Sequence, residues 1–443
     1  MDPFEQFYGQ SEDDPLDALR KLLRDLGLPD DIDVNDAQAR TDLFRTMMQR
    51  FMPSEGMSDD EMVWSTVRQM ARHLVASLGP DPSGSSRAAR QVSDAVHLAE
   101  LWLSEATVLP PVSMTSVVWS RAEWIENTLA AWKSMLEPVI GILTAGVNDA
   151  TRSHFDVDSE AETAEMQAVL RPLVSKAISA MFGAHVGEGL GQAATSTMTG
   201  TDFGLPLIPE PIIATLPTNL AAVQHQTDLE EEGLLLYCSL REVARQRLFH
   251  EVAWIAPQII ALVQHYAREM RVDPDVITTV MENAVIDHLS ADNLASQSDF
   301  SALLFAPDQS EEQIQILARL HTLLALVEGW VDNVTSTVAH QWFPGWEPIA
   351  ESLRRHRATS KSGRSIVTPL IGLGASTKAV RDAASFWETI RVAKGIEGRD
   401  EIWKYPESMP EPHDISDPQR FLNKALPEND PFDDELRKFL GEG

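Results

Sequence analysis

Cysteine is almost absent from this chain of 443 residues, because Cys238 is the only one. One cysteine cannot form an internal disulfide, which is typical of proteins in a reducing compartment, so we expect a cytoplasmic protein. Cys238 lies within an apolar segment with helical spacing. We therefore expect a buried, inert thiol rather than a catalytic one.

Positive charge is also scarce. The chain has 36 Lys and Arg against 67 Asp and Glu, which gives a formal net charge of −31. Nucleic acids and anionic membranes both require a basic surface, so neither is expected as the main partner. The sequence also lacks an apolar run of membrane-spanning length and a basic-then-apolar leader segment, so no membrane span is predicted.

What the sequence has in abundance is helical periodicity. The pattern predicts a mainly α fold, a large multi-helix domain with few or no short strands. Ile212 to Leu216, flanked by prolines, is the one candidate strand. The longest helix expected, at about 311–340, has an apolar stripe and should lie at the centre of the core. The predicted helices are 16–27, 60–78, 87–107, 116–149, 159–183, 185–198, 218–232, 233–249, 252–271, 275–289, 311–340, 347–358 and 376–395.

The distribution of charge and turn residues predicts three parts of the chain: an acidic, partly flexible N-terminal segment at 1–58, a helical domain at 59–410, and an acidic, Pro-rich tail at 411–443. Gly183, Gly187 and Gly191 recur at every fourth residue, which opens one helix face to a close neighbour. Because no strand precedes these glycines, close helix packing is favoured over a phosphate-binding loop.

A pair of histidines is missing where a zinc protease would carry it. In H-E-x-x-H, two imidazoles one turn apart bind zinc, and the glutamate activates a water. Within Ser239 to Phe249, Glu242 occupies the glutamate position, but Arg241 and Arg245 occupy the histidine positions. A guanidinium group stays protonated and has no lone pair to donate to a metal. The sequence also has no Gly-x-Ser-x-Gly motif for a serine nucleophile.

Several ordered segments between about 60 and 425 resemble an actinobacterial zincin-like family of hydrolases and zinc-dependent metalloproteases. These segments are 92–103, 119–124, 200–206, 240–249, 326–331 and 398–403. The resemblance implies a zincin-like fold for 59–410, with a further histidine after the Glu-Gly pair of 326–331. In this chain Trp330 follows Glu328 and Gly329, so Arg241, Arg245 and Trp330 stand at the former metal positions. Glu242 alone matches, as a vestigial general base, and the prediction for cofactors is none.

Zinc held by other ligands remains an alternative, because twelve histidines are scattered along the chain. His250-Glu251-x-x-Trp254 approaches the zinc motif but lacks one imidazole, and Pro257 implies that a new helix starts near 254. We interpret it as a chance match.

The helical spacing of the two arginines suggests what replaces the metal. Arg241 and Arg245 are one turn apart, as are Glu328 and Asp332 on the helix expected to face them. We hypothesise an ion-pair cluster of these four residues with Glu242, since the planar guanidinium group suits paired bonds to carboxylates. The alternatives are that both arginines lie on an exposed helix face, or that they bind an anion or a peptide carboxylate.

Three functions follow from these alternatives. The first is a catalytically inactive zincin that acts as a protein-binding or scaffolding module in the cytoplasm. The second is an active zinc-dependent metallopeptidase that uses non-standard ligands. The third is a small-molecule or anion binder in the former active-site cleft.

Overall fold

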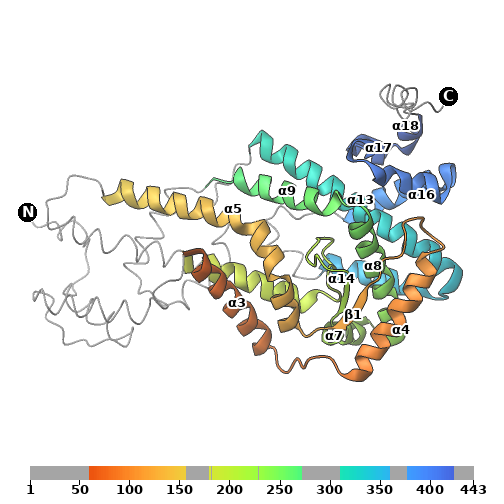
Figure 1. Cartoon of the computed structure of the whole chain (residues 1–443), viewed down its shortest axis with the longest axis horizontal. Coiled ribbons are helices and arrows are strands. Elements are labelled where there is room, and N and C mark those ends of the chain that lie inside the picture. The colour runs from red at the N-terminus through yellow and green to blue at the C-terminus, as the bar shows by residue number, and fades with distance from the viewer. Residues whose placement is uncertain are drawn as a thin grey trace, which may run out of the picture. The chain divides into compact units, whose positions relative to one another are not determined.

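The computed structural model describes residues 59–155, 179–180, 182–227, 229–271, 310–359 and 377–423. Within these ranges the fold is mainly helical, as predicted, with two strands of four residues each (Figure 1). The helices predicted at 16–27 and 275–289, and most of the one at 159–183, lie outside the described residues. The chain divides into two compact units, 1–65 with 144–183 and 273–304, and 66–143 with 184–272 and 305–443. Every contact discussed below lies within the second unit.

The predicted helices correspond to observed ones, with shifts of several residues at some ends. The helices are α3 (Asp59–Ser77), α4 (Ser86–Leu103), α5 (Arg121–Phe155), a helix at 182–196, α7 (Pro217–Thr227), α8 (Glu231–Glu251), α9 (Ile255–Arg268), α13 (Glu311–Trp342), α14 (Trp346–Thr359) and α16 (Thr377–Asp400). Two 3-10 turns, η2 (Glu401–Lys404) and η3 (Pro406–Ser408), and the short helices α17 (Pro412–Ser416) and α18 (Pro418–Asn423) follow. The last two fall in the segment assigned to the tail, and Phe421 of α18 packs edge-on against Phe386 of α16.

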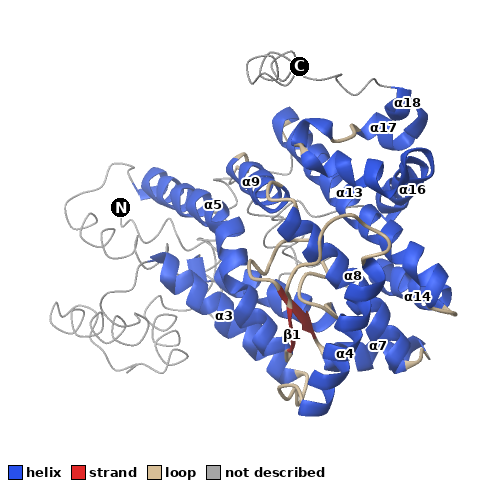
Figure 2. Cartoon of the chain, turned by 45° about the vertical axis from the view of Figure 1, so that its right-hand side comes forward, coloured by secondary structure: helices blue, strands red, loops and turns tan. Residues whose placement is uncertain are grey.

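A two-stranded parallel sheet lies among the helices (Figure 2). Strand β2 (Ile212–Thr215) confirms the predicted strand, and it pairs with β1 (Thr115–Val118). The helix predicted at 116–149 was therefore wrong at its start, because Thr115–Val118 is extended and the helix begins at Arg121. The end of β2 also bridges to Thr199, which fixes the loop at 197–204 beside α8.

Helix α13 is central, as the apolar stripe predicts, and it packs against α16, α8 and α9. Its first turn is closed by a reciprocal capping box between Ser310 and Gln313. A Cβ at Gly329 would lie 2.6 Å from the Cβ of Ala383, so only glycine allows α16 to approach so closely. Among the described helices, α13 alone is long and apolar enough to cross a membrane, but 56% of that window is buried inside the protein. It is therefore best described as a core helix.

Helix α8 is surrounded on all sides, by α4, α7, α13, α14 and β2. Every residue from Tyr237 to Phe249 is buried, including Cys238 as predicted. The helix has charged residues in its middle, and a buried charge is costly unless it is paired or hydrogen-bonded. This requirement creates the candidate site.

The glycine repeat serves close packing, as predicted. A Cβ at Gly187 would lie 2.5 Å from the carbonyl oxygen of Val67, and one at Gly191 would lie 2.6 Å from Leu74 Cδ2. Both neighbours belong to α3, so the 182–196 helix rests directly on the α3 backbone.

Candidate functional site

The candidate site lies between α8 and α13. Arg241 Nη2 donates to Glu328 Oε2 at 2.8 Å, and its Nη1 donates to Asp332. Arg245 donates from Nε to Glu328 Oε1 at 2.6 Å and from Nη2 to Glu328 Oε2 at 3.1 Å. Glu328 thus bridges both arginines. We call Arg241, Glu242, Arg245, Glu328 and Asp332 the arginine cluster.

The two arginines are buried, so the alternative of an exposed helix face is wrong. Arg241 is 5% exposed and Arg245 is 0% exposed. Burial acts to lower the pKa of each guanidinium, but the neighbouring carboxylates outweigh it and raise both pKa values. Both side chains are therefore cations held in place by Glu328 and its neighbours.

Glu242 is fully buried, and both of its carboxylate oxygens accept hydrogen bonds. Oε2 accepts from the Thr199 hydroxyl and from Arg245 Nη1, both at 2.8 Å. Oε1 accepts from the Thr201 N–H at 3.0 Å and from the Thr201 hydroxyl at 2.8 Å. Burial raises the pKa of Glu242, whereas Arg245 and the two threonine hydroxyls act to lower it. A general base must reach the proton that it removes, and this carboxylate instead faces protein donors on both oxygens.

Trp330 does not belong to this cluster. It is two residues from Glu328, which places it about 200° further around the helix. Its Nε1 donates to Asp400 Oδ1 at 2.9 Å, and the Arg399 guanidinium lies 5.7 Å from its ring centroid. Trp330, which the resemblance places with the two arginines at a former metal position, therefore pairs with Asp400 instead, and Glu328 is the α13 residue that bonds to both arginines.

A second buried network surrounds Asp400, and the sequence analysis did not identify it. Asp400 Oδ2 accepts from the Thr107 hydroxyl at 2.6 Å and from the Val108 N–H at 2.9 Å. Arg399 donates to Asp400 Oδ1 and to Asn333 Oδ1, both at 2.8 Å. We call Thr107, Trp330, Asn333, Arg399 and Asp400 the Asp400 network.

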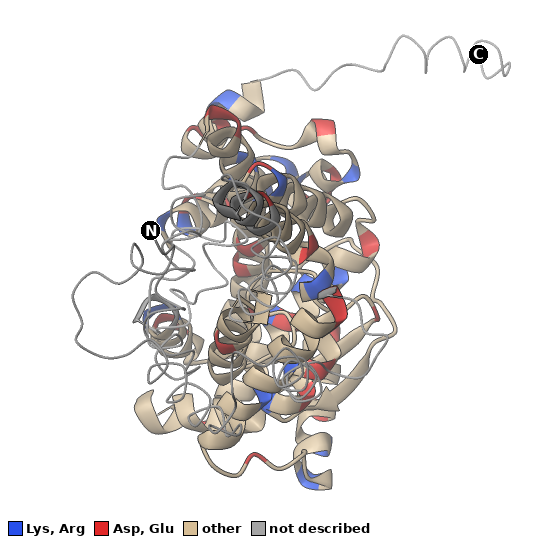
Figure 3. Cartoon of the chain, turned by 90° about the vertical axis from the view of Figure 1, so that its left-hand side faces the viewer, with Lys and Arg blue, Asp and Glu red and all other residues tan. Residues whose placement is uncertain are grey.

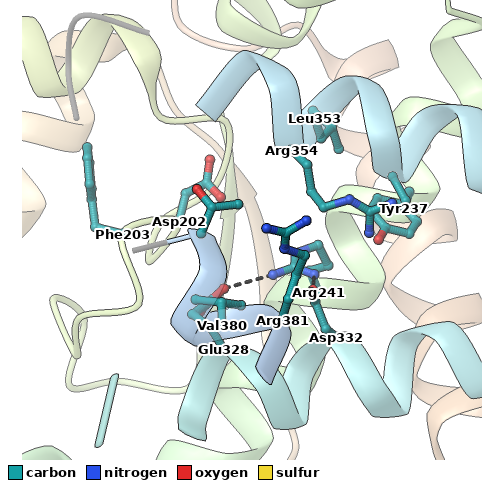
Figure 4. Close-up of a pocket in the computed structure, with 12 residues that line it drawn as sticks. Asp202, Phe203, Tyr237, Arg241, Glu328, Asp332, Leu353, Arg354, Val380 and Arg381 are labelled. Atoms are coloured by element: carbon teal, nitrogen blue, oxygen red, sulfur yellow. Dashed lines mark hydrogen bonds and ion pairs between the residues drawn. The ribbon is translucent and has the colours of Figure 1, made fainter. Parts of the chain in front are cut away.

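A pocket of about 220 Å³ opens beside the arginine cluster (Figure 4). Its walls come from the 197–204 loop and from α8, α13, α14 and α16. The lining residues are Asp202, Phe203, Tyr237, Arg241, Glu328, Asp332, Ala350, Leu353, Arg354, Thr377, Val380 and Arg381. Glu242 and Arg245 lie behind this wall and do not line the pocket. Gly204, with φ +73°, keeps the loop close to α13, because a Cβ there would lie 3.2 Å from Glu328 Oε1.

The sequence analysis missed four polar residues near the site. Thr199 and Thr201 hold Glu242, and Arg354 and Arg381 line the pocket. The 200–206 segment was noted for its resemblance, but no local pattern connected it with Glu242, more than forty residues away.

The chain matches the zincin-like metallopeptidase family over residues 63–422. It belongs to this family. The crystal structure of a putative hydrolase with a novel fold from Chloroflexus aurantiacus is similar to this chain, with a TM-score of 0.54 and 20% sequence identity. The similarity covers 83% of this chain and 99% of that one, and at this identity it shows the fold alone. Among curated proteins, none matches the chain.

The family name implies zinc, and the residues of the arginine cluster do not fit it. Zinc in a catalytic site takes three protein ligands from histidine, cysteine or carboxylate groups. Here Arg241 and Arg245 occupy the two helix positions with guanidinium groups, and Glu328 is engaged by both of them. Because a guanidinium group is a cation without a donor lone pair, neither arginine can serve as a zinc ligand at its position.

One other group of described residues has the composition of a metal site. His265 and Glu269 of α9 and Glu312 of α13 have donor atoms within 4.8 Å of one another. His265 and Glu312 are exposed and Glu269 is half-buried, and none of the three lines the pocket beside the arginine cluster. This surface group is a separate place to test for zinc.

Proposed function

We propose that this zincin-like protein does not hydrolyse peptides at its inherited site, and that it acts in the cytoplasm as a protein-binding module. One observation carries the proposal: Arg245 is fully buried at the second ligand position and is paired with Glu242 and Glu328. The residue that would activate water and a residue placed to bind metal are thus both committed to an ion-pair cluster.

The tryptophans do not supply the binding surface. All eleven lie within the described residues, and Trp342, at 46%, is the one that is exposed. Figure 3 shows Lys and Arg scattered among Asp and Glu along the described helices. The pocket beside the arginine cluster offers a surface for recognition that combines charged and apolar residues.

The test is a metal and activity measurement on the purified full-length protein. We expect substoichiometric zinc after dialysis against zinc-containing buffer, and no chelator-sensitive cleavage of denatured casein. Stoichiometric zinc that is removed by chelator together with peptidase activity would overturn the proposal.

The alternative, an active zinc-dependent hydrolase with non-standard ligands, is favoured by the surface group of His265, Glu269 and Glu312. The variant His265→Ala separates the two functions. If this substitution removes both bound zinc and hydrolysis, the surface group is the active centre. If zinc is lost and no hydrolysis was present, the metal binds there without catalysis.

A further inference from the structure

The pocket beside the arginine cluster is rich in arginine. Three of its twelve lining residues are arginine, whereas Lys and Arg together make up 36 of the 443 residues in the chain. In Figure 4, Arg241, Arg354 and Arg381 gather on one side of the pocket, with Asp202 and Phe203 on the other. An arginine-rich wall in so acidic a chain points to a negatively charged group on the ligand.

The three arginines are not equally available to a ligand. Arg241 is already paired with Glu328 and Asp332. Arg354 uses its Nε for Glu351 at 3.2 Å, and Arg381 makes no hydrogen bond or ion pair with any residue that the structure describes. The Arg381 guanidinium and the terminal nitrogens of Arg354 can therefore donate hydrogen bonds to an anionic ligand.

The rest of the lining limits the charge of that partner. Asp202, Glu328 and Asp332 also line the pocket, and they would repel a dianion such as phosphate. A carboxylate carries a single charge and matches the planar fork of arginine. The apolar groups of Phe203 and Val380 favour a hydrophobic body next to the carboxylate.

We propose that this pocket binds the C-terminal residue of a polypeptide partner, with its α-carboxylate on Arg381 and Arg354. The side chain of that residue then lies against Phe203, Leu353 and Val380. Arg381 is exposed at the rim, which leaves room for the rest of the peptide to continue into solvent. The proposal rests on the proposed function, because a partner that is bound and not cleaved keeps its C-terminus.

The test compares two acetylated pentapeptides by isothermal titration calorimetry with the full-length protein. Both have four alanines followed by leucine, and one ends in a free carboxylate while the other ends in an amide. We expect the acid to bind about 10- to 100-fold more tightly than the amide, because it alone makes charged hydrogen bonds with arginine. Arg381→Gln should weaken binding of the acid by a similar factor.

Lys378→Gln is the matched control, because Lys378 lies one turn away on α16 and pairs with Asp382 outside the pocket. It removes the same charge and should change the affinity by no more than about twofold. Equal binding of acid and amide, equal effects of the two substitutions, or the absence of binding at millimolar peptide would overturn the pocket assignment. Tighter binding of free leucine than of the acid peptide would overturn the peptide assignment.

Mass spectrometry of the peptides after titration separates this proposal from the proposed function. Binding that depends on Arg381, with the peptide intact, supports both. Cleaved peptide would overturn the non-hydrolytic function while the carboxylate site stands. A peptide that stays intact and does not bind would overturn the carboxylate site and leave the non-hydrolytic function standing.

Discussion

Helix α13 contributes to two buried charge networks on different faces, and they differ in how completely they are closed. In the Asp400 network, the side chains of Arg399 and Asp400 are both 0% exposed. In the arginine cluster, the α13 carboxylates Glu328 and Asp332 keep 13% and 17% exposure. One network is sealed, and the other forms the wall of a pocket.

The partners of each network explain this difference. The Asp400 network joins chain segments almost three hundred residues apart, because Thr107 and Asp400 share a hydrogen bond and Arg399 donates to the Ala106 carbonyl at 2.6 Å. It therefore holds the fold together. The arginine cluster contains Arg241 and Arg245, two of the three positions where the family resemblance expects metal ligands, and it lies next to an open pocket. Burial alone does not tell a structural charge network from a functional one. A pocket beside the buried charges is the feature that distinguishes the arginine cluster from the Asp400 network.

The largest effect is expected from Asp400→Asn. The substitution keeps the side-chain shape but leaves the buried Arg399 cation without its carboxylate, which should reduce the free energy of unfolding by about 3–5 kcal/mol. Asp332→Asn should cost less, about 1.5–3 kcal/mol, because Arg241 keeps Glu328 and Asp332 is partly exposed. Urea denaturation followed by tryptophan fluorescence measures both.

The control is Asp382→Asn, whose partner Lys378 is 78% exposed, and the loss there should be at most about 1 kcal/mol. If Asp400→Asn and Asp332→Asn reduce the free energy of unfolding equally, then the greater solvent exposure of the arginine cluster does not make its ion pairs less important for stability.

A second test converts the arginine cluster into a metal site. Arg241→His combined with Arg245→His removes both cations and places two imidazoles beside Glu328, a ligand set that zinc enzymes use. We expect zinc to bind this variant and to stabilise it by about 2.7 kcal/mol at a hundred times its Kd. Thermal unfolding with and without zinc measures the shift.

Arg247→His is the control for that variant, because Arg247 is buried on α8 but directed toward α4, where its Nη2 lies 3.4 Å from the Glu100 carbonyl oxygen. Zinc should not stabilise it. If zinc fails to stabilise a folded double variant, then Arg241, Arg245 and Glu328 do not converge on a metal position.

Part of this comparison was predictable from the sequence. Helical spacing placed Arg241 with Arg245 and Glu328 with Asp332, and the resemblance suggested that the two helices face each other. The contact of Trp330 with Asp400 was not predicted, because a resemblance gives a position along a helix but not the face on which a residue lies. Trp330 is two residues from Glu328, and at ~100° per residue this places the two side chains about 200° apart around the helix.

The rest depends on long-range contacts that have no local signal. The Thr107–Asp400 bond, the Thr199 and Thr201 bonds to Glu242, and the pairing of β1 with β2 all join distant segments. The β1 residues are four amino acids, TSVV, next to a strongly helical stretch. Their β-branched side chains were the available signal, and it was too short to outweigh the helical pattern.

The smallest effect is expected at the outer edge of the Asp400 network, where Glu388 accepts from Asn333 at 2.9 Å and from Arg391 at 2.6 and 2.8 Å. The hydrogen bonds from Arg391 lower the pKa of Glu388 below its ordinary 4.5. Its ionised form therefore stabilises the folded state above about pH 4.5, and this contribution is lost as the pH falls through the lowered pKa.

Glu388→Gln should thus reduce the free energy of unfolding at pH 7 by less than about 1 kcal/mol, because the side chain is 46% exposed. The difference from the parent protein should shrink below about pH 4.5, where the parent carboxyl also becomes protonated. Urea titrations at several pH values measure it, with Glu397→Gln as the control: Glu397 is exposed beyond the kink at Gly395 of α16 and has no ion pair among the described residues. If the difference in free energy of unfolding between Glu388→Gln and the parent protein does not change with pH, then Glu388 contributes through packing. Its charge would then add nothing to the Asp400 network.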